Sequence, residues 1–372
     1  MINWNKYSTE PTNSNLLEYP TIIDVVEDIL NYENANTQLS MFPLAKDRTW
    51  LYKMEEPGHY MAVHTKDDMW MVDLCPTGRC PFTLYRGESQ CYSSCTPSLL
   101  RTKDEKEILR SYLQTAELEC IIKQHPVISN FFLHDIYHPQ LVRTFRLEVQ
   151  YEGLAQHYGN LTPQLDLTND KWVAAFFAIT NFRNGIYEVV EPTGDQRCGK
   201  LYRCKNIDFN DSNRMHPKPL GMQYFNRPGK QSAYTLDMRN LRDLNLYPGI
   251  ECIYFRHDNY ANQLLFDLCQ QGRRYFPDDS LVEIVKQLKI SNSFSEEAVE
   301  ITRVSHYPKM SRKEMKAYLH QYSIDIILSS KIGFDKNRMK KDWELWQNGE
   351  KQRYLNDLLI FPISKNILSV RK

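Results

Sequence analysis

The sequence lacks the motifs of the most common nucleotide-binding and hydrolytic enzymes. It contains no Walker loop, no Gly-x-Gly-x-x-Gly, no His-Glu-x-x-His and no Gly-x-Ser-x-Gly. These absences disfavour the P-loop, Rossmann, zincin and α/β-hydrolase classes, each of which depends on one of those motifs. Low-complexity tracts and internal repeats are also missing, which disfavours disordered, fibrous and solenoid chains.

Long hydrophobic runs are missing as well. The longest purely apolar run, Val173–Ile179, is far shorter than the roughly 20 residues that cross a bilayer, so no membrane association is expected. The segment 1–20 lacks the basic and apolar regions of a signal peptide. Because the chain also has nine cysteines, an odd number, we expect a cytoplasmic protein with reduced thiols rather than a disulfide framework.

The composition that is present is that of an ordinary globular protein. Apolar residues make up 42% of the chain and charged residues 25%, and the net charge is zero. These proportions are typical of a folded chain and not of a disordered one. The charge is unevenly distributed, because Lys and Arg outnumber Asp and Glu from residue 301 onward. We therefore expect a basic C-terminal module on an acidic body.

Helical and strand-like patterns predict an α+β fold with mixed or antiparallel sheets flanked by helices. The expected parts are an N-terminal arm and helix over 1–39, an α+β domain over 40–290 and a basic, mainly helical extension over 291–372, joined by a linker at 291–295. Apolar periodicity predicts helices from Thr21, after Pro97 to Ile121, over 141–156 and 169–179, from Asn262 to Gly272, over 280–290 and after Ser311. Strand patterns predict a small antiparallel sheet over 50–84 and strands at 185–191, 200–205, 232–238 and 251–256.

The triplet Tyr85-Arg86-Gly87 stands at the end of an expected strand. A guanidinium fork can grip a phosphate at two points, and a glycine lets a ligand approach the backbone. The triplet is therefore a candidate anion clamp. A surface salt bridge beside a turn is the alternative, and three residues taken alone favour that alternative.

A second polar cluster, Gln156-His157-Tyr158-Gly159, follows an expected helix, and Asp166 and Thr168 come soon after it. Histidine can act as an acid or a base near neutral pH, and a tyrosine ring can stack on a ligand. Helix capping is the alternative role, for His157 at one helix end and for Thr168 or Asn169 at the start of the next. Because both polar groups flank one strongly apolar helix, we favour a site at these element ends.

Two other sets of residues have weaker claims to function. The cysteines that flank the triplet lack the two-residue gaps of a zinc ribbon, so no metal is expected at Cys75, Cys80, Cys91 and Cys95. The segment 336–353 and the residues after it mix positive charges with aromatic rings, a composition suited to nucleic acid. These residues are Lys336, Arg338, Lys340, Lys341, Lys351 and Arg353, with Trp343, Trp346, Tyr354 and Phe361. The aromatic rings fit the buried face of a helix equally well.

The order of these motifs resembles the FRG domain family, which is named for its Phe/Tyr-Arg-Gly signature. The resemblance covers residues 40–290. The similar elements are, in order, Tyr85–Gln90, Thr96–Arg101, Gln156–Gly159, Leu165–Thr168, Val173–Ala178, Arg227–Tyr234 and Leu264–Leu288. The chain departs from the family pattern at Pro163, Leu167 and Ala233, where Arg, Trp and Gly are usual. The missing arginine removes one polar contact that the family pattern implies.

The resemblance implies a domain of bacterial defence or toxin type that handles a nucleotide or NAD, through a distant similarity to ADP-ribosyltransferases. It implies cofactor contacts from Tyr85, Arg86, Gly87, Gln156, Tyr158 and Thr168, and catalytic roles for His157, Asp166 and Gln231. Gln231 stands where such enzymes carry a glutamate, and an amide cannot supply the charge that stabilises an oxocarbenium ion. A non-catalytic module that recognises a ligand or nucleic acid, and a purely structural role for the motifs, are the alternatives.

Overall fold

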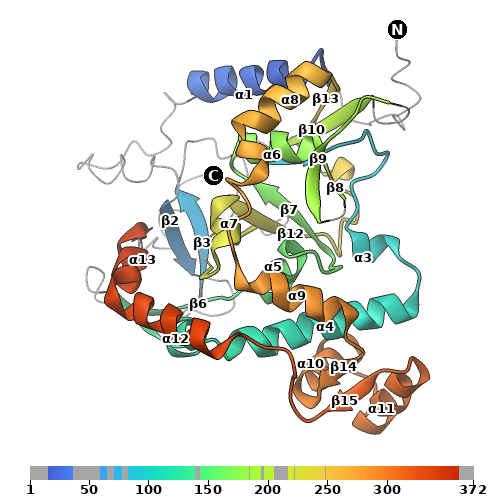
Figure 1. The fold of residues 1–372 in the computed structure, drawn as a ribbon, viewed down its shortest axis with the longest axis vertical. Helices are drawn as coiled ribbons and strands as arrows, with labels where there is room; N and C mark the ends of the chain where they lie inside the picture. Colours follow the sequence, from blue (N-terminus) through green and yellow to red (C-terminus); the bar gives the residue numbers. More distant parts are fainter. Residues whose placement is uncertain are drawn as a thin grey trace, which may run out of the picture.

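A computed structural model describes residues 16–36, 59–64, 71–77, 83–138, 143–183, 185–193, 197–204, 217–221, 223–247 and 249–359. The expected irregular arm before residue 16 and the run at 50–52 lie outside these residues. The fold is α+β, as the sequence predicts. A seven-stranded sheet carries helices on both faces, and a five-stranded sheet lies beside it (Figure 1).

The seven-stranded sheet has the strand order β1-β13-β10-β4-β7-β12-β11. β1 runs parallel to β13, and the other neighbours are antiparallel. The bounds are β1 (Leu16–Tyr19), β13 (Ile250–Arg256), β10 (Cys198–Cys204), β4 (Leu84–Glu88), β7 (Gln164–Thr168), β12 (Ala233–Asp237) and β11 (Lys218–Pro219). Strands β8 (Thr180–Arg183) and β9 (Ile186–Val189) form a separate hairpin. The strands predicted from 185 to 256 are confirmed.

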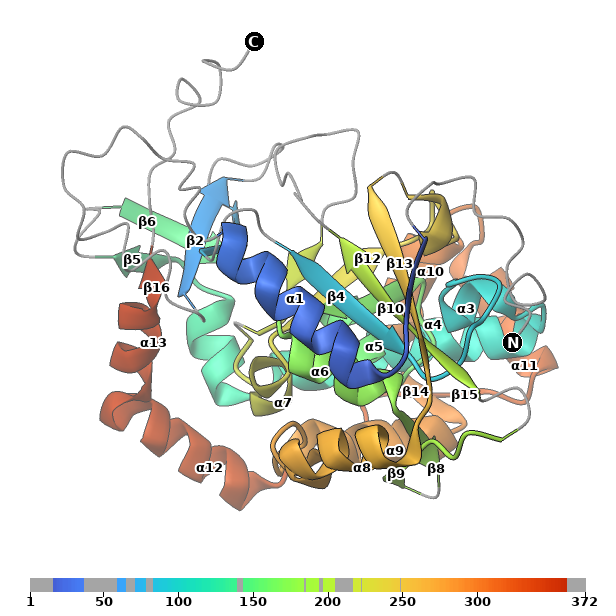
Figure 2. The same cartoon turned by 90° about the horizontal axis from the view of Figure 1, so that it is seen from above.

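The two faces of this sheet are covered by different helices, because side chains alternate along each strand. Tyr85 of β4 packs with α1 (Ile22–Asn36), α6 (Lys171–Ala178) and α8 (Asn259–Leu268). Its neighbour Leu84 packs on the other face with α4 (Glu105–Lys123), α5 (Tyr151–His157) and α9 (Ser280–Ile290). Figure 2 shows α1 lying across the sheet above β4. Burial of both faces fixes β4, and with it Arg86, in the centre of the molecule.

The five-stranded sheet has the order β16-β2-β3-β6-β5. Its strands are β16 (Leu358–Leu359), β2 (His59–His64), β3 (Met71–Thr77), β6 (Arg143–Leu147) and β5 (Ile136–His138). The antiparallel pairing of β2 with β3 is as predicted. The prediction of a helix over 141–156 is wrong at its start, because 143–147 is strand β6. Apolar and polar residues alternate strictly from 144 to 149 in the sequence, which is the period of a strand.

The C-terminal extension packs on α4. It contains β14 (Ser293–Ser295), α10 (Glu296–His306), α11 (Arg312–Gln321), β15 (Asp325–Ile327), α12 (Lys336–Leu345) and α13 (Lys351–Asp357). Phe294 is fully buried beside Leu109 and Leu113 of α4, so the expected linker at 291–295 is packed into the structure. Ser311 and Glu314 form the predicted capping box. In Figure 1, α10 and α11 lie against one end of α4, and α12 and α13 beside the other.

Short helical turns and caps complete the fold. The short elements are α3 (Ser98–Arg101), α7 (Asn226–Lys230), two 3-10 turns (Leu244–Leu246 and Gln270–Gly272) and two π-helical turns (Ile128–Phe132 and Trp346–Glu350). Thr21 and Asp24 cap α1 as predicted, with Thr21 N donating to Asp24 Oδ2 at 2.8 Å. Two helix starts differ from the expectation. Asp170 caps α6 in place of Thr168 or Asn169, and α8 begins at Asn259, capped by Asp258, and not at Asn262.

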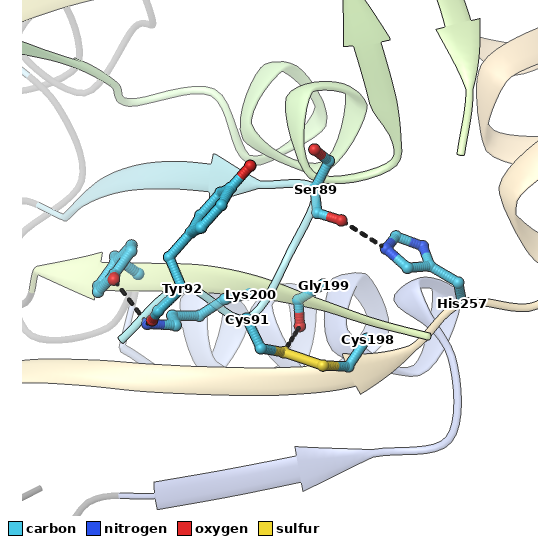
Figure 3. Close-up of a disulfide and its surroundings, with 8 residues drawn as sticks. Ser89, Cys91, Tyr92, Cys198, Gly199, Lys200 and His257 are labelled. Atoms are coloured by element: carbon cyan, nitrogen blue, oxygen red, sulfur yellow. Dashed lines mark hydrogen bonds between the residues drawn. A yellow bond between two sulfur atoms is a disulfide. The ribbon is translucent and has the colours of Figure 1, made fainter. Parts of the chain in front are cut away.

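The segment that follows β4 is fastened to β10 and to the end of β13 (Figure 3). Cys91 and Cys198 form a disulfide, Lys200 Nζ donates to the carbonyl of Tyr92 at 2.7 Å, and His257 Nε2 donates to the carbonyl of Ser89 at 3.0 Å. The expectation of reduced thiols is therefore wrong for Cys91 and Cys198. The free cysteines of the described residues are Cys95, Cys120, Cys204, Cys252 and Cys269. The side chains of Cys75 and Cys80 lie outside the described residues.

Glu117 of α4 is expected to stabilise the attachment of the C-terminal extension. Its Oε2 accepts from Ser295 N at 2.8 Å and from Ser295 Oγ at 2.7 Å, and the residue is 1% exposed. Glu117→Ala leaves the buried Ser295 amide without its acceptor, so we expect a loss of about 2 kcal/mol in the free energy of unfolding. Urea unfolding followed by circular dichroism measures this loss.

Glu119→Ala, two residues further along the same helix, is the matched control. Glu119 pairs with Lys123 at the surface, at 2.5 Å, so its removal should cost less than about 1 kcal/mol. Equal losses in the two variants would contradict the role given to Glu117.

Candidate functional site

The Tyr85-Arg86-Gly87 triplet lies on β4, between β10 and β7. Tyr85 is fully buried in the core, on the face that packs against α6. Gly87 lies so close to α6 that a Cβ atom would come within 1.9 Å of the carbonyl oxygen of Ala174. Tyr85 and Gly87 therefore shape the packing of the strand against its helix, and Arg86 is the residue of the triplet that carries charge.

Arg86 connects β4 to β7. The two strands share one register pair, Tyr85 with Thr168. Beyond that pair, Arg86 Nη1 donates to the carbonyl oxygen of Asp166 at 2.8 Å, so a side chain joins the strands there. Arg86 Nε lies 3.7 Å from Glu88 Oε1. Because the Arg86 side chain is 23% exposed and the Glu88 side chain 9%, this ion pair is largely shielded from solvent.

The environment of Arg86 balances its charge with carboxylates. Burial opposes the charge of Arg86, but neighbouring groups raise its pKa above the ordinary value. Burial also raises the pKa of the adjacent Cys95 thiol to about 12, so that thiol is neutral at physiological pH. The negative charge facing Arg86 therefore comes from Glu88 and Asp166. Glu88 is absent from the site residues that the sequence predicts, although residues two apart on a strand share a face.

His157 and Asp166 face each other at the end of α5 and on β7. His157 Nδ1 lies 3.8 Å from Asp166 Oδ1. Gln156 Nε2 donates to Asp166 Oδ2 at 3.4 Å, and Thr162 Oγ1 donates to Gln156 Oε1 at 2.7 Å. The His157 side chain is 4% exposed and the Asp166 side chain 36%, so the pair is exposed to solvent only on its Asp166 side. Arg86, Gln156, His157 and Asp166 are thus brought together, and we call them the Asp166 cluster.

Thr168 and Gln231 form a separate pair that supports the fold. Thr168 Oγ1 donates to the carbonyl oxygen of Gln231 at 2.7 Å and accepts from Asp170 N at 3.0 Å. Gln231 Nε2 donates to the carbonyl oxygen of Tyr275 at 3.1 Å, and Gln231 is 4% exposed. Their polar side-chain groups are used in contacts that hold the ends of β7 and α7 and the segment around Tyr275, between α8 and α9, together.

Tyr158 belongs to a third group, which includes a residue that the sequence did not single out. Tyr158 OH donates to Asp279 Oδ2 at 2.6 Å, and Arg227 N donates to the same oxygen at 3.1 Å. The Arg227 guanidinium lies 5.2 Å from the Tyr158 ring centre and 4.9 Å from that of Phe276. Arg227 is 70 residues from the His157 motif in the sequence, and no local pattern links it to that motif.

Tyr187 on β9 connects the Asp166 cluster to Arg227. Burial raises the pKa of the Tyr187 phenol, the positive charge of Arg227 lowers it, and the negative charge of Asp166 raises it. Both charges therefore lie within electrostatic reach of one hydroxyl group. The Tyr187 ring stacks on Phe276, with ring centres 4.5 Å apart. Arg227 itself lies over the ring of Tyr158, whose centre is 5.8 Å from that of the His157 ring, so Arg227 stands beside the Asp166 cluster.

Several polar atoms of this region are buried without a hydrogen-bond partner among the described residues. They are Arg86 Nε, His157 Nε2, Asp166 Oδ1 and Arg227 Nε. A buried polar group that lacks a partner costs about 1–3 kcal/mol, so such groups are uncommon in structural cores. Buried polar atoms without such a partner also occur elsewhere in the described chain, for example on Glu117, His125 and Thr302. It is therefore the chemistry of the residues that carry them, and not their number, that makes this region a candidate ligand site.

Residues 82–185 match the family model of the FRG domain. The chain contains an FRG domain. This domain includes β4, α5, β7 and α6, and therefore the whole Asp166 cluster. No curated protein and no solved structure matches the chain. Arg227, Gln231 and Asp279 lie beyond the matched residues and reach the FRG domain through the contacts described above.

The basic segment 336–353 lies apart from the FRG site residues in sequence and partly faces solvent. Trp346 is 3% exposed and packs against Phe131 and Phe132, with ring centres 5.0 and 6.1 Å away. The interpretation of this ring as the buried face of a helix is confirmed, which removes it as a base-stacking surface. The positive side chains Lys336, Lys340, Lys341, Lys351 and Arg353 are exposed. Phe361 lies outside the described residues.

Two further findings concern metal ions and membrane spans. Within the described parts of the chain, no group of three or more His, Cys, Asp or Glu residues is arranged to hold a metal ion. None of the helices that the structure describes has the length and apolar character needed to cross a membrane.

Proposed function

We propose that the FRG domain binds NAD at the Asp166 cluster and transfers ADP-ribose from it to an acceptor. The observation that carries this proposal is the pairing of the buried His157 with the partly exposed Asp166 carboxylate inside the FRG match, where His157 Nε2 has no hydrogen-bond partner among the described residues. NAD supplies a glycosidic bond to nicotinamide that a nucleophile can displace. The choice of NAD rests on the resemblance of the motifs to those of ADP-ribosyltransferases.

His157 is the proposed general base. Its Nδ1 lies 3.8 Å from Asp166 Oδ1, so a carboxylate stands beside the imidazole ring. Its Nε2 is buried and has no hydrogen-bond partner among the described residues, and in this proposal it accepts the proton of the acceptor group that enters the site. This is the arrangement of a base held by a third group, in which Gln156 fixes the carboxylate in turn.

Asp166 also takes the role that the family resemblance gave to residue 231. Stabilisation of an oxocarbenium-like transition state needs a carboxylate close to the sugar. The Gln231 amide is neutral and already donates to Tyr275, whereas the Asp166 carboxylate is charged and partly open to solvent. Arg86 is a positioning residue in this proposal, because it holds the main chain of Asp166 and is itself held by Glu88.

Titration with NAD and incubation with labelled NAD test the proposal directly. We expect NAD to raise the melting temperature of the wild-type protein, and the label to appear on an acceptor protein, an acceptor nucleic acid or water. Asp166→Asn preserves the size of the side chain and removes its charge, so it should retain most of the thermal shift and lose the transfer. The absence of a shift, of transfer and of hydrolysis in the wild-type protein would refute the proposal.

Nucleic acid is the alternative ligand, and its most plausible contact is the exposed charge of residues 336–353. Replacing Lys340, Lys341 and Lys351 by Gln is expected to leave NAD binding unchanged, because these side chains contribute nothing to the Asp166 cluster. If the segment binds nucleic acid, the same triple variant should reduce the salt dependence of that binding by about one unit of slope for each phosphate that it no longer neutralises. Filter binding at several salt concentrations separates the two functions.

A further inference from the structure

Arg227 is a cation without a matching anion. Its guanidinium lies over the rings of Tyr158 and Phe276, and its Nε is buried with no hydrogen-bond partner among the described residues. Cation–π contacts hold the group in place but leave its N–H donors unused. A guanidinium held over two rings can therefore donate two hydrogen bonds to one anion.

Lys289 of α9 brings a second positive charge to the same place. Its Nζ lies 3.0 Å from the position that a Cβ of Gly159 would occupy, so the ammonium group rests directly on the end of the Gln156–Gly159 motif. Lys289 is an exposed residue, but its partial burial lowers its pKa, and the charge of Arg227 lowers it further. Lys289 Nζ rests on Gly159, and the Arg227 guanidinium lies over the ring of the preceding residue, Tyr158, so both positive charges stand at the end of the same motif. Like charges repel each other, and a bound anion would relieve that repulsion.

The nearby carboxylate does not neutralise these charges. Asp279 Oδ2 accepts from Tyr158 OH and from Arg227 N, while Asp279 Oδ1 accepts from Leu281 N at the start of α9. Among the described residues, neither the Arg227 guanidinium nor the Lys289 ammonium forms an ion pair with a carboxylate within 4.0 Å. Asp279 therefore orients Arg227 and Tyr158 through neutral donors, and the two cations keep their net charge.

We propose that Arg227 and Lys289 form an anion subsite that binds the phosphate groups of the nucleotide, beside the Asp166 cluster. The identity of the nucleotide rests on the proposed function, whereas the subsite itself rests on the contacts of Arg227 and Lys289. Both charges lie beyond residues 82–185, on α7 and α9. The site is thus completed by elements that follow the FRG match in the chain. Gly159 has no Cβ, which at this position would come within 3.0 Å of Lys289 Nζ, so the glycine leaves that face of the ammonium group uncovered by a side chain of its own.

Calorimetric titration of the full chain with inorganic pyrophosphate and with NAD tests this subsite. Arg227→Gln and Lys289→Gln are each expected to weaken the binding of both probes at least about tenfold, since a hydrogen bond to a charged group contributes that much. Arg227→Lys should recover part of the affinity, because it restores the charge without the fork. Lys286→Gln, an exposed charge one turn earlier on α9, is the matched control and should leave binding unchanged.

The outcomes separate the subsite from the proposed function. If pyrophosphate binds and the two Gln variants weaken it while NAD does not bind, the subsite stands and the NAD proposal falls. If NAD binds equally well to the wild-type protein and both Gln variants, the subsite is refuted and the NAD proposal stands. If the wild-type protein binds neither probe, both are refuted. Lys289 is exposed, so Lys289→Gln should fold normally even if Arg227→Gln loses stability.

Discussion

Gly87→Ala is expected to lower the free energy of unfolding by more than about 3 kcal/mol, at or above the upper end of the usual cost of overpacking a core. The added methyl group would lie 1.9 Å from the carbonyl oxygen of Ala174 and 2.6 Å from the amide nitrogen of Ala178. Both are backbone atoms of α6, so no side-chain rotation relieves the clash. Either α6 or β4 must move, and Arg86 moves with β4. Thermal and urea unfolding measure the decrease in stability.

Gly333→Ala is the control for this substitution. A Cβ at residue 333 meets no atom within 4 Å, and Gly333 has no positive φ. We expect that variant to be unchanged or more stable by up to about 1 kcal/mol, through the reduced entropy of the unfolded chain. A Gly87→Ala protein as stable as the Gly333→Ala protein would show that β4 and α6 are not packed as described.

His157→Asn is expected to reduce the rate of ADP-ribose transfer by about 10²–10⁴-fold, which is the usual contribution of a general base. Asparagine is close to histidine in polarity but cannot accept the proton. NAD affinity should change little, because the proposed phosphate contacts come from Arg227 and Lys289 and not from His157. Initial rates over a range of NAD concentrations give kcat and KM separately, and the reduction should fall on kcat.

His134→Asn is the control that separates a loss of catalysis in His157→Asn from a general loss of folded protein. His134 is exposed, so His134→Asn should leave both the rate and the melting temperature unchanged. If His157→Asn lowers the melting temperature and leaves the rate of the folded fraction intact, His157 is structural. That result would favour the alternative in which the motifs only build the fold.

The order of motifs in the sequence predicts the location of the site better than its chemistry. Arg86, Gln156, His157 and Asp166 are all identifiable from the sequence motifs. Gln156 and His157 lie at the end of α5, as the sequence suggests, whereas Arg86 and Asp166 lie in the middle of β4 and β7 and not at the element ends that the sequence suggests. Thr168 and Gln231 stand out with them, but they bond to the main chain of Gln231 and Tyr275 respectively. A sequence pattern does not reveal which partner a side chain meets, so the separation of these two groups required the structure.

The features that the sequence does not reveal are contacts between residues that lie far apart in the chain. Arg227 and Lys289 reach the Gln156–Gly159 motif from 68 and 130 residues beyond Gly159, through the packing of α7 and α9. The disulfide between Cys91 and Cys198 joins residues 107 apart, and cysteine spacing alone does not give such a pairing. Strand β6 is a different case, because its period-two pattern is readable in the sequence. The apolar content of 141–156 suggests a helix there, but the periodicity is the better guide.

A crystal structure of the protein with ADP-ribose tests the central claim most directly. We predict ligand density in contact with the Asp166 cluster, with the ribose beside Asp166 and the diphosphate within hydrogen-bonding distance of the Arg227 and Lys289 side chains. His157 Nε2 should then face the anomeric carbon of the ribose. Density at another surface, or none at saturating ligand, with Arg227 and Lys289 unchanged, would contradict the account.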